Sequence, residues 1–229
     1  LAAGSRHIPV IIHESDMTPG LANKLCIPSA AKICCNFPEA MEHLPKGKAV
    51  LTGTPIRQEL FHGNPLDAIQ FTGLQANKPT ILVIGGSTGS VRVNEAVREC
   101  LDELLKTYQI IHLCGKGKLD IAYEHRDGYV QYEYIKKELS SLLALADIVI
   151  SRAGANAICE LQALAKPNLL IPLGAKASRG DQILNAESFK KQGFSYVLPE
   201  EDLTKETLLN AVDQVYTHRA DYQAAMKNS

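Results

Sequence analysis

A single carboxylate follows a turn of small residues in the segment "ISRAGANAICE" (150–160). An apolar strand is predicted to lead there into a helix, with Glu160 one turn from Asn156 at the edge of the apolar stripe. The Glu160 side chain would tilt back toward the start of that helix. A carboxylate in this place repels a phosphate, but it can accept two hydrogen bonds from the vicinal hydroxyls of a ribose. The alternative is an ordinary first-turn glutamate that the helix dipole stabilises.

Two turns of small residues each open a helix directly after an apolar strand. "GGSTGS" (85–90) follows "TILVI", and "RAGANA" (152–157) follows "DIVIS". Free backbone N–H groups and the positive end of the helix dipole favour an anion at such turns. Two of them in one domain predict a ligand with two phosphates, or with a phosphate and a polar sugar. Tight packing with helix capping by Ser87 and Asn156 explains the same residues without a ligand.

A third polar group follows the strand "NLLIPL" (168–173). Asp181, Gln182 and Asn185 share one face at the start of a predicted helix, because residues three and four apart are neighbours on a helix. Such a face suits sugar hydroxyls, which need both donors and acceptors. An N-terminal cap by Asp181 is the alternative.

Several cofactor and metal sites are disfavoured by the same motifs. "GGSTGS" lacks the GxGxxG spacing of dinucleotide-binding turns, and no acidic residue closes the next strand. A Walker-type lysine is missing as well, which argues against ATP hydrolysis. The sequence has no DxD-like metal pair, and its six cysteines lack paired CxxC spacing, which indicates buried thiols. We therefore expect neither a cofactor nor a metal.

Composition indicates a globular chain of 229 residues, with 45% hydrophobic residues and a formal net charge of −1. This balance suggests no nucleic-acid partner. No apolar run approaches the roughly 18 residues that span a bilayer, and no signal peptide is evident, which favours a cytoplasmic location. The first segment, "LAAGSRHIPVIIHE", lacks a methionine and enters a strand through what resembles the end of a helix, so we expect a fragment.

Apolar runs of strand length alternate with amphipathic stretches of helical length, a rhythm typical of α/β folds with parallel sheets covered on both faces. Strands are expected at 9–14, 31–37, 48–53, 80–86, 109–115, 129–135, 147–154, 168–173 and 195–200. Helices are clearest at 90–107, 138–146, 156–166, 181–192 and 204–228. A stretch rich in Gly, Pro and Asn predicts a linker at 63–79, between the remnant of an N-terminal domain (1–62) and a C-terminal domain (80–229). Ligands of such sheets bind at the carboxyl ends of the strands.

Motifs along almost the whole chain resemble the MurG family of bacterial transferases. The matching segments are "HESDMTPGLANKL", "TGTPIRQEL", "GGSTGS", "SRAGANAICELQALAKP" and "DQILNAESFKKQGFSYVLPEEDLT". The family transfers N-acetylglucosamine (GlcNAc) from UDP-GlcNAc to undecaprenyl-pyrophosphoryl-muramoyl-pentapeptide, converting lipid I into lipid II in peptidoglycan synthesis. The resemblance implies the GT-B architecture, in which two Rossmann-like domains face a cleft and the C-terminal one holds most of the donor.

The resemblance also implies roles for individual residues. Arg57 and Ser87 would contact the diphosphate, the backbone of Ile135 would read the uracil, and Glu160 would bind the ribose. Asp181, Gln182 and Asn185 would face the GlcNAc, with Gln182 the foremost contact. The remaining residues of the implied site are Gly86, Thr88 and Gly154 in the two turns, and His13, Glu14 and Asp16 near the reacting centre.

Departures from the family pattern also carry expectations. The family's N-terminal glycine-rich loop, which carries its general base, and its C-terminal tail are absent from this sequence, so the isolated fragment should be inactive. Asp16 replaces an asparagine, and Asp181 replaces a residue that is often glutamine or histidine.

The expected reaction is an inverting, metal-independent displacement of UDP, with helix N-termini and Arg57 stabilising the leaving group. His13 would be a base only if it reached the acceptor hydroxyl. Membrane contact at the cytoplasmic face would come through the missing domain.

Three other functions stay open at this point. A glycolipid synthase of related fold would share the donor domain and differ in the acceptor domain. A UDP-GlcNAc 2-epimerase would share the outline but needs further acid and base residues. A non-catalytic nucleotide-sugar binding module would need a separate membrane-bound subunit.

Overall fold

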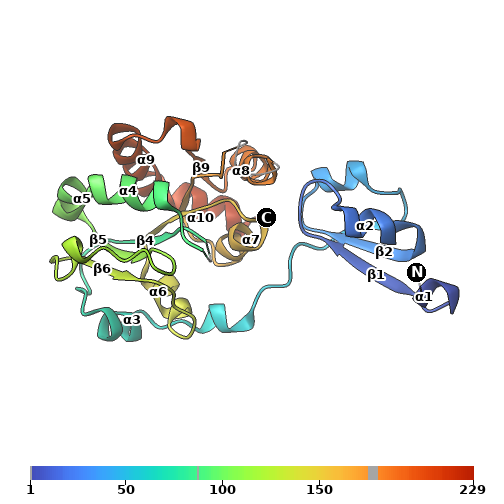
Figure 1. Ribbon diagram of the computed structural model, residues 1–229, viewed down its shortest axis with the longest axis horizontal. Coiled ribbons are helices and arrows are strands. Elements are labelled where there is room, and N and C mark those ends of the chain that lie inside the picture. Colours follow the sequence, from blue (N-terminus) through green and yellow to red (C-terminus); the bar gives the residue numbers. More distant parts are fainter. Residues whose placement is uncertain (1, 87, 175–179) are drawn as a thin grey trace.

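Two parallel sheets make up the computed structural model, which describes residues 2–86, 88–174 and 180–229 (Figure 1). The smaller sheet has the strand order β1-β2-β3, and the larger one has the order β6-β5-β4-β7-β8-β9. The strands are β1 Val10–Glu14, β2 Ala30–Cys35, β3 Ala49–Leu51, β4 Thr80–Ile84, β5 Gln109–Leu113, β6 Tyr129–Tyr132, β7 Ile148–Ser151, β8 Asn168–Leu170 and β9 Tyr196–Val197. Each strand lies inside a range expected from the sequence, except that β2 begins one residue earlier. All of them are shorter than expected, because the apolar runs continue into the turns that follow.

Helices and 3₁₀ turns connect the strands. The α-helices are α1 Ala2–Ser5, α2 Leu21–Cys26, α3 Pro65–Thr72, α4 Val91–Glu99, α5 Leu101–Thr107, α6 Leu139–Leu145, α7 Ala155–Ala163, α8 Asp181–Lys191, α9 Lys205–Thr217 and α10 Arg219–Lys227. The 3₁₀ turns are η1 Ile27–Ser29, η2 Glu39–His43, η3 Gln58–His62, η4 Ile121–Tyr123 and η5 Glu200–Asp202.

Two helices expected to be continuous are broken. The stretch 90–107 divides at Cys100 into α4 and α5, and the stretch 204–228 divides at His218 into α9 and α10. Neither break contains a glycine or proline, the residues that usually mark one. The amphipathic pattern continues across both breaks, so it could not reveal them.

The larger sheet is covered on both faces, as the alternation of its buried side chains requires. In β4, Ile81 and Val83 belong to one hydrophobic cluster with α4, α5 and α9. Leu82, between them, belongs to another cluster with α3 and α6. Figure 1 shows these two helical layers on opposite sides of the sheet. The prediction of a parallel α/β sheet covered on both faces is therefore correct.

Part of the predicted linker at 63–79 is helical. Asn64 caps α3 by accepting a hydrogen bond from the N–H of Leu66, Pro65 occupies the first turn, and Gly73 ends the helix at φ +72°. These are the residues that favour helix boundaries. The Asn, Pro and Gly that suggested a linker therefore delimit a short helix that packs against α6. The division of the chain into domains at 63–79 remains a prediction.

The smaller sheet meets the larger unit through a limited set of contacts. The ring of Phe37 packs edge-on against Phe189 of α8 at 6.2 Å, and Ser188 donates a hydrogen bond to Glu39 at 2.9 Å. In Figure 1 a single extended stretch of chain joins the two units.

Candidate functional site

The order of the strands places a cavity beside the carboxyl ends of β4 and β7. The chain leaves β4 for β5 and β6 on one side and returns to β7 on the other side. Ligands of open parallel sheets bind at such a reversal. A cavity of about 550 Å³ lies there, and four of the predicted residues line it: Gly86, Thr88, Gly154 and Gln182.

Glycine is required at two positions of the turn after β4, where the backbone approaches other segments. A Cβ on Gly85 would lie 2.6 Å from the N of Ser90, and one on Gly89 would lie 1.9 Å from the O of Cys114. Gly89 also has φ +70°, a conformation that other residues rarely adopt. The small residues of "GGSTGS" thus let the turn pack tightly against the segment that follows β5.

The caps of the two helices differ from the expectation. Ser90 caps α4, because its Oγ accepts a hydrogen bond from the N–H of Val93 at 3.3 Å. Gly154 precedes α7 and makes no side-chain cap, while Asn156 lies inside the helix and is exposed. Asn156 is therefore not a cap, because the helix begins one residue earlier than predicted. Ser87 lies outside the described residues.

A buried polar network fixes the start of α4. Asn94 donates from Nδ2 to the O of Cys114 at 2.9 Å, and its Oδ1 lies 3.0 Å from Nε2 of His112. Nδ1 of His112 lies 2.9 Å from the hydroxyl of Tyr129. Burial lowers the pKa of His112 to about 3, with a smaller contribution from the charge of Arg98. The ring is therefore neutral and holds α4 against β5.

Glu160 and Arg57 contact each other. Glu160 lies on α7, and its carboxylate accepts two hydrogen bonds from Arg57, Nε to Oε1 at 3.0 Å and Nη2 to Oε2 at 3.3 Å. The Glu160 side chain is 22% exposed and that of Arg57 is 50% exposed. Neither residue lines the cavity described above. The predicted ribose and diphosphate roles are therefore untested, and the two side chains satisfy each other in this structure.

The polar face of α8 is divided between structural bonds and the cavity. Gln182 lines the cavity and accepts a hydrogen bond from the N–H of Leu173 at 3.0 Å. Asn185 is buried and donates to the O of Ala153 at 3.1 Å, so it ties α8 to the turn after β7. Asp181 begins the helix, and Gly180 occupies the N-cap position. Asp181 is therefore not the cap, and of these three predicted residues only Gln182 reaches the cavity.

Ile135 lies three residues beyond the end of β6 rather than within the strand. Its side chain is 6% exposed and packs in the hydrophobic cluster that contains Leu60 and Leu142. This packing anchors the segment after β6. Recognition of uracil by its backbone remains a prediction.

The predicted residues of β1 have mainly structural partners. Glu14 is buried, and its carboxylate accepts hydrogen bonds from the N–H of Asp16, the N–H of Gly20 and the amide of Asn23, at 3.0, 3.0 and 2.8 Å. His13 is exposed, and its Nε2 lies 3.2 Å from the O of Gly53. Burial raises the pKa of Asp16, and the charges of Asp181 and Glu14 add to the effect. Asp16 therefore lies close enough to Asp181, at the start of α8, for the two charges to interact.

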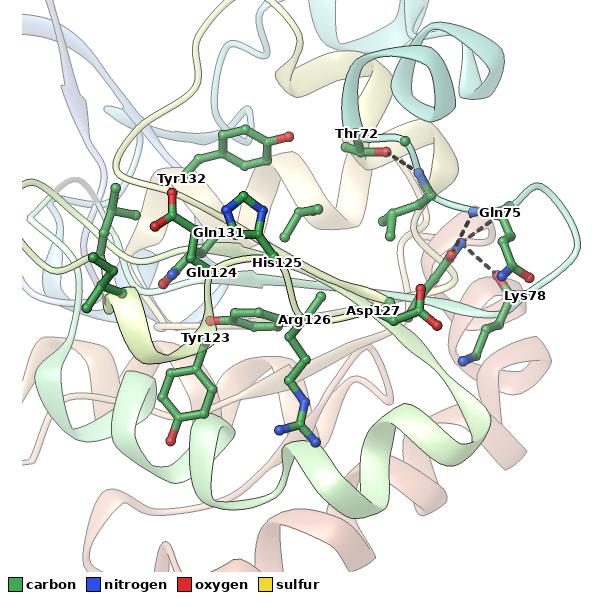
Figure 2. Close-up of a pocket in the computed structure, with 18 residues that line it drawn as sticks. Thr72, Gln75, Lys78, Tyr123, Glu124, His125, Arg126, Asp127, Gln131 and Tyr132 are labelled. Carbon is green, nitrogen blue, oxygen red and sulfur yellow. Dashed lines mark hydrogen bonds between the residues drawn. The ribbon is translucent and has the colours of Figure 1, made fainter.

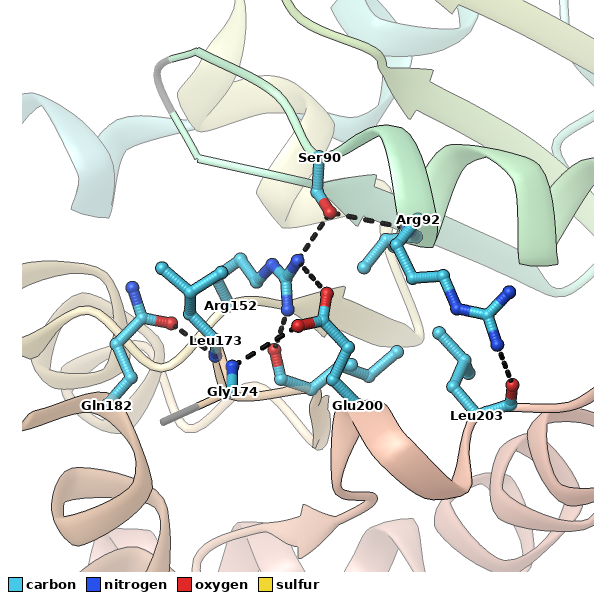
Figure 3. A network of polar contacts seen from close by, with 10 residues as sticks. Ser90, Arg92, Arg152, Leu173, Gly174, Gln182, Glu200 and Leu203 are labelled. Carbon is cyan, nitrogen blue, oxygen red and sulfur yellow. Dashed lines mark hydrogen bonds and ion pairs between the residues drawn. The ribbon is translucent and has the colours of Figure 1, made fainter. Parts of the chain in front are cut away.

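Three charged residues without a predicted role line the cavity, namely Arg92, Arg152 and Glu200. Arg152 follows β7 directly, and its buried guanidinium forms an ion pair with Glu200 (Figure 3). It also donates to Oγ of Ser90 at 2.6 Å and to the O of Ile171 at 3.1 Å. The position of Arg152 directly after a strand could have marked it as a site residue, because ligands bind at the carboxyl ends of such strands. Glu200 is 48 residues away, and no local pattern could join the two.

Comparison with known proteins identifies the family. Residues 80–229 match the family described as "Glycosyltransferase family 28 C-terminal domain". The chain belongs to this glycosyltransferase family.

Two similar relatives share one name. The UDP-N-acetylglucosamine–N-acetylmuramyl-(pentapeptide) pyrophosphoryl-undecaprenol N-acetylglucosamine transferase of Lachnoclostridium phytofermentans is 67% identical over all 229 residues. The transferase of the same name from Lachnospira eligens is 63% identical over the same length. The chain spans 64% and 65% of the lengths of these relatives.

Solved structures of glycosyltransferases share the fold. The crystal structure of MurG from Acinetobacter baumannii has a TM-score of 0.71 at 24% identity, covering 98% of this chain and 62% of that one. The calicheamicin glycosyltransferase CalG4 has a TM-score of 0.66 at 15% identity, covering 98% and 64%. The predicted GT-B fold class is confirmed by these likenesses.

A larger cavity lies away from the predicted residues. It measures about 710 Å³ and includes Lys78 and Gln109, at the amino ends of β4 and β5, and runs along the edge strand β6 (Figure 2). None of the predicted site residues lines it, and it lies away from the strand reversal. The predicted site residues therefore favour the cavity beside β4 and β7 over this one.

The described residues show neither a cluster of metal-ligating side chains nor a membrane-spanning helix. Between residues 2 and 229, apart from 87 and 175–179, no group of three or more His, Cys, Asp or Glu side chains could hold a metal ion. In the same residues, no helix has the length and apolar character needed to cross a membrane.

Proposed function

We propose that this chain supplies the donor site for transfer of N-acetylglucosamine from UDP-GlcNAc to undecaprenyl-pyrophosphoryl-N-acetylmuramyl-pentapeptide. One observation carries the proposal: the small-residue turns after β4 and β7 meet at a single cavity, where the chain reverses direction across the sheet. Relatives at 67% and 63% identity bear the name of this transferase, which supports the choice of donor and acceptor.

The reaction proposed for the site is an inverting displacement. An acceptor hydroxyl oxygen bonds to the anomeric carbon of GlcNAc, the bond from that carbon to the β-phosphate oxygen breaks, and UDP leaves with the electron pair. A base takes the hydroxyl proton. Negative charge grows on the diphosphate during this step, so groups that stabilise it accelerate the reaction.

Three features of the cavity favour a leaving diphosphate without a metal. Free N–H groups at the starts of α4 and α7 and the positive ends of both helix dipoles point there. The guanidinium of Arg152, which is paired with Glu200, lies beside them. The proposed transfer is therefore metal-independent. Neither Glu14 nor His13 is proposed as the base, because Glu14 already accepts hydrogen bonds from three donors and His13 contacts Gly53.

The lipid-linked acceptor defines the proposed partner and place of action. A soluble nucleotide sugar and an undecaprenyl-linked substrate meet at the membrane surface, so we place the enzyme at the cytoplasmic face of the bacterial membrane as a peripheral protein. In this proposal the 229-residue chain binds the donor but does not complete the transfer by itself.

Calorimetric titration tests the donor site directly. The chain should bind UDP and UDP-GlcNAc without added metal, and UDP-glucose more weakly than UDP-GlcNAc. Equal affinity for ADP and UDP, or binding that requires magnesium, would contradict the proposal. Incubation with UDP-GlcNAc followed by analysis of the sugar tests the 2-epimerase alternative, because a 2-epimerase would invert C2 and a donor site alone would leave it unchanged.

A further inference from the structure

The ion pair of Arg152 and Glu200 joins four segments around the cavity (Figure 3). Arg152 donates to the O of Ile171, after β8, and to Oγ of Ser90, at the start of α4. Glu200 accepts a second hydrogen bond, from the N–H of Gly174 at 3.2 Å. Burial opposes ionisation of Glu200, but the hydrogen bonds from Arg152 and Gly174 outweigh it and lower the pKa of the carboxyl. The pair is therefore charged on both sides and fixed at several points.

Ser90 uses both lone pairs of its hydroxyl oxygen. An arginine has no acceptor atom, so Oγ of Ser90 must accept the bond from Nη2 of Arg152 at 2.6 Å. It also accepts the bond from the N–H of Val93 at 3.3 Å. A hydroxyl has two lone pairs and one proton, so these bonds leave the proton to be donated. Within the described part of the chain, Ser90 donates no hydrogen bond, and both bonds of its Oγ are accepted ones.

The hydroxyl of Ser90 lies at the cavity rather than in the core behind it. Ser90 is 7% exposed and lines the cavity together with Arg152 and Glu200. It also stands at the start of α4, beside N–H groups that point in the same direction. A ligand that places acceptor oxygens there meets a hydroxyl whose proton is available and whose oxygen is held in place.

We propose that Ser90 donates a hydrogen bond to the diphosphate of the nucleotide sugar, and that Arg152 is the positioning residue that orients it. Glu200 holds Arg152 in place and offsets its charge in the absence of a ligand. This inference rests on the proposed function, because it assumes a diphosphate in the cavity. In this site the Ser90 hydroxyl donates to the ligand, and the ion pair of Arg152 and Glu200 holds the hydroxyl in position.

Affinities for UDP and for uridine separate this role from a purely structural one. Ser90→Ala should weaken UDP binding roughly tenfold or more, the effect expected for a hydrogen bond to a charged group, and leave uridine binding unchanged. Ser141→Ala is the matched control, because Ser141 likewise accepts a backbone N–H, that of Asn64 at 3.1 Å, and lies away from the cavity. Its UDP affinity should equal that of the wild type.

The positioning role is tested in variants that remove the pair. Arg152→Met leaves the carboxylate of Glu200 unpaired, so it should lower both the melting temperature and UDP affinity. Adding Glu200→Met should restore the melting temperature but leave UDP binding at least tenfold weaker. In that double variant, a further Ser90→Ala should cost little, because effects through one shared contact are not additive.

Each outcome decides between the proposals. If the wild type binds UDP and Ser90→Ala binds it equally well, this inference is wrong and the proposed function stands. The positioning role is also wrong if the double variant recovers full UDP affinity, or if Ser90→Ala costs a further tenfold within it. If the wild type binds no UDP, the proposed function fails and this inference fails with it.

Discussion

Arg57, directly before η3, and Glu160, on α7, are 103 residues apart in the sequence and form an ion pair with two hydrogen bonds. The hydrogen bond to Glu160 is the main reason that the pKa of Arg57 is raised. Both side chains were predicted to bind the nucleotide, Glu160 at the ribose and Arg57 at the diphosphate. If that prediction is correct, the ribose must displace Arg57 from the carboxylate. Displacement should be easy, because a pair with a half-exposed arginine contributes about 0–1 kcal/mol.

Arg57→Ala should raise the affinity of this chain for UDP by up to about fivefold. The variant removes a group that competes with the ribose for Glu160, and the worth of an exposed ion pair limits the gain. Calorimetric titration measures the change, and Arg57→Lys, which keeps the positive charge, is the control. A fall in UDP affinity would show instead that Arg57 already contacts the diphosphate in this chain.

Glu160→Ala should weaken UDP binding by about 1.5–3 kcal/mol, the range for hydrogen bonds to a charged group. Glu160→Gln should cost less, because its amide oxygen still accepts a hydrogen bond. The deciding ligand is 2′-deoxy-UDP, which lacks one of the two hydroxyls: it should bind the wild type more weakly than UDP and lose little further affinity in the alanine variant. An unchanged preference between the two ligands, with a lower melting temperature, would assign Glu160 to the ion pair alone.

Two glycines at the cavity should respond to alanine in opposite ways. Gly89→Ala should lower the free energy of unfolding by more than about 2 kcal/mol, because the new Cβ meets the O of Cys114 and φ is +70°. Gly154 has φ −68°, and its Cβ would enter open space. Gly154→Ala should therefore cost less than about 1 kcal/mol of stability but weaken UDP binding, since the methyl group occupies the cavity. Thermal melts and titrations of both variants check this, and loss of stability in Gly154→Ala would argue against an open space there.

His112 should make the fold sensitive to mild acid. Its folded pKa of about 3 lies below its unfolded value near 6.5, so the unfolded chain binds more protons between these values. The free energy of unfolding should fall as the pH drops below about 6.5, by up to about 1.4 kcal/mol per pH unit from this residue. Denaturant melts from pH 7 to pH 4 measure the slope. His112→Gln should flatten it, and His43→Gln, at an exposed position, should leave it unchanged.

Local sequence patterns predicted each strand and the two turns that line the cavity. Apolar runs mark buried strands because both faces of a parallel sheet are covered, as Leu82 and Val83 illustrate from opposite faces of β4. Gly85 and Gly89 of "GGSTGS" mark a turn because only glycine fits their close approaches to other backbone segments. The Asn, Pro and Gly around α3 did not reveal this helix for a related reason: these residues favour helix boundaries and loops alike, and only packing against α6 distinguishes the two.

The sequence by itself determined the family and predicted the two turns that line the cavity, because both depend on residues that are close together in the chain. The tertiary structure decided which charges meet. It joined Glu160 to Arg57 rather than leaving it free, and it brought Glu200 to Arg152 across 48 residues. Ion pairing depends on distances between side chains of a few ångströms, and those distances follow from the path of the whole chain. A local pattern carries no information about that path, so it could propose each charged residue as a ligand group but could not assign its partner.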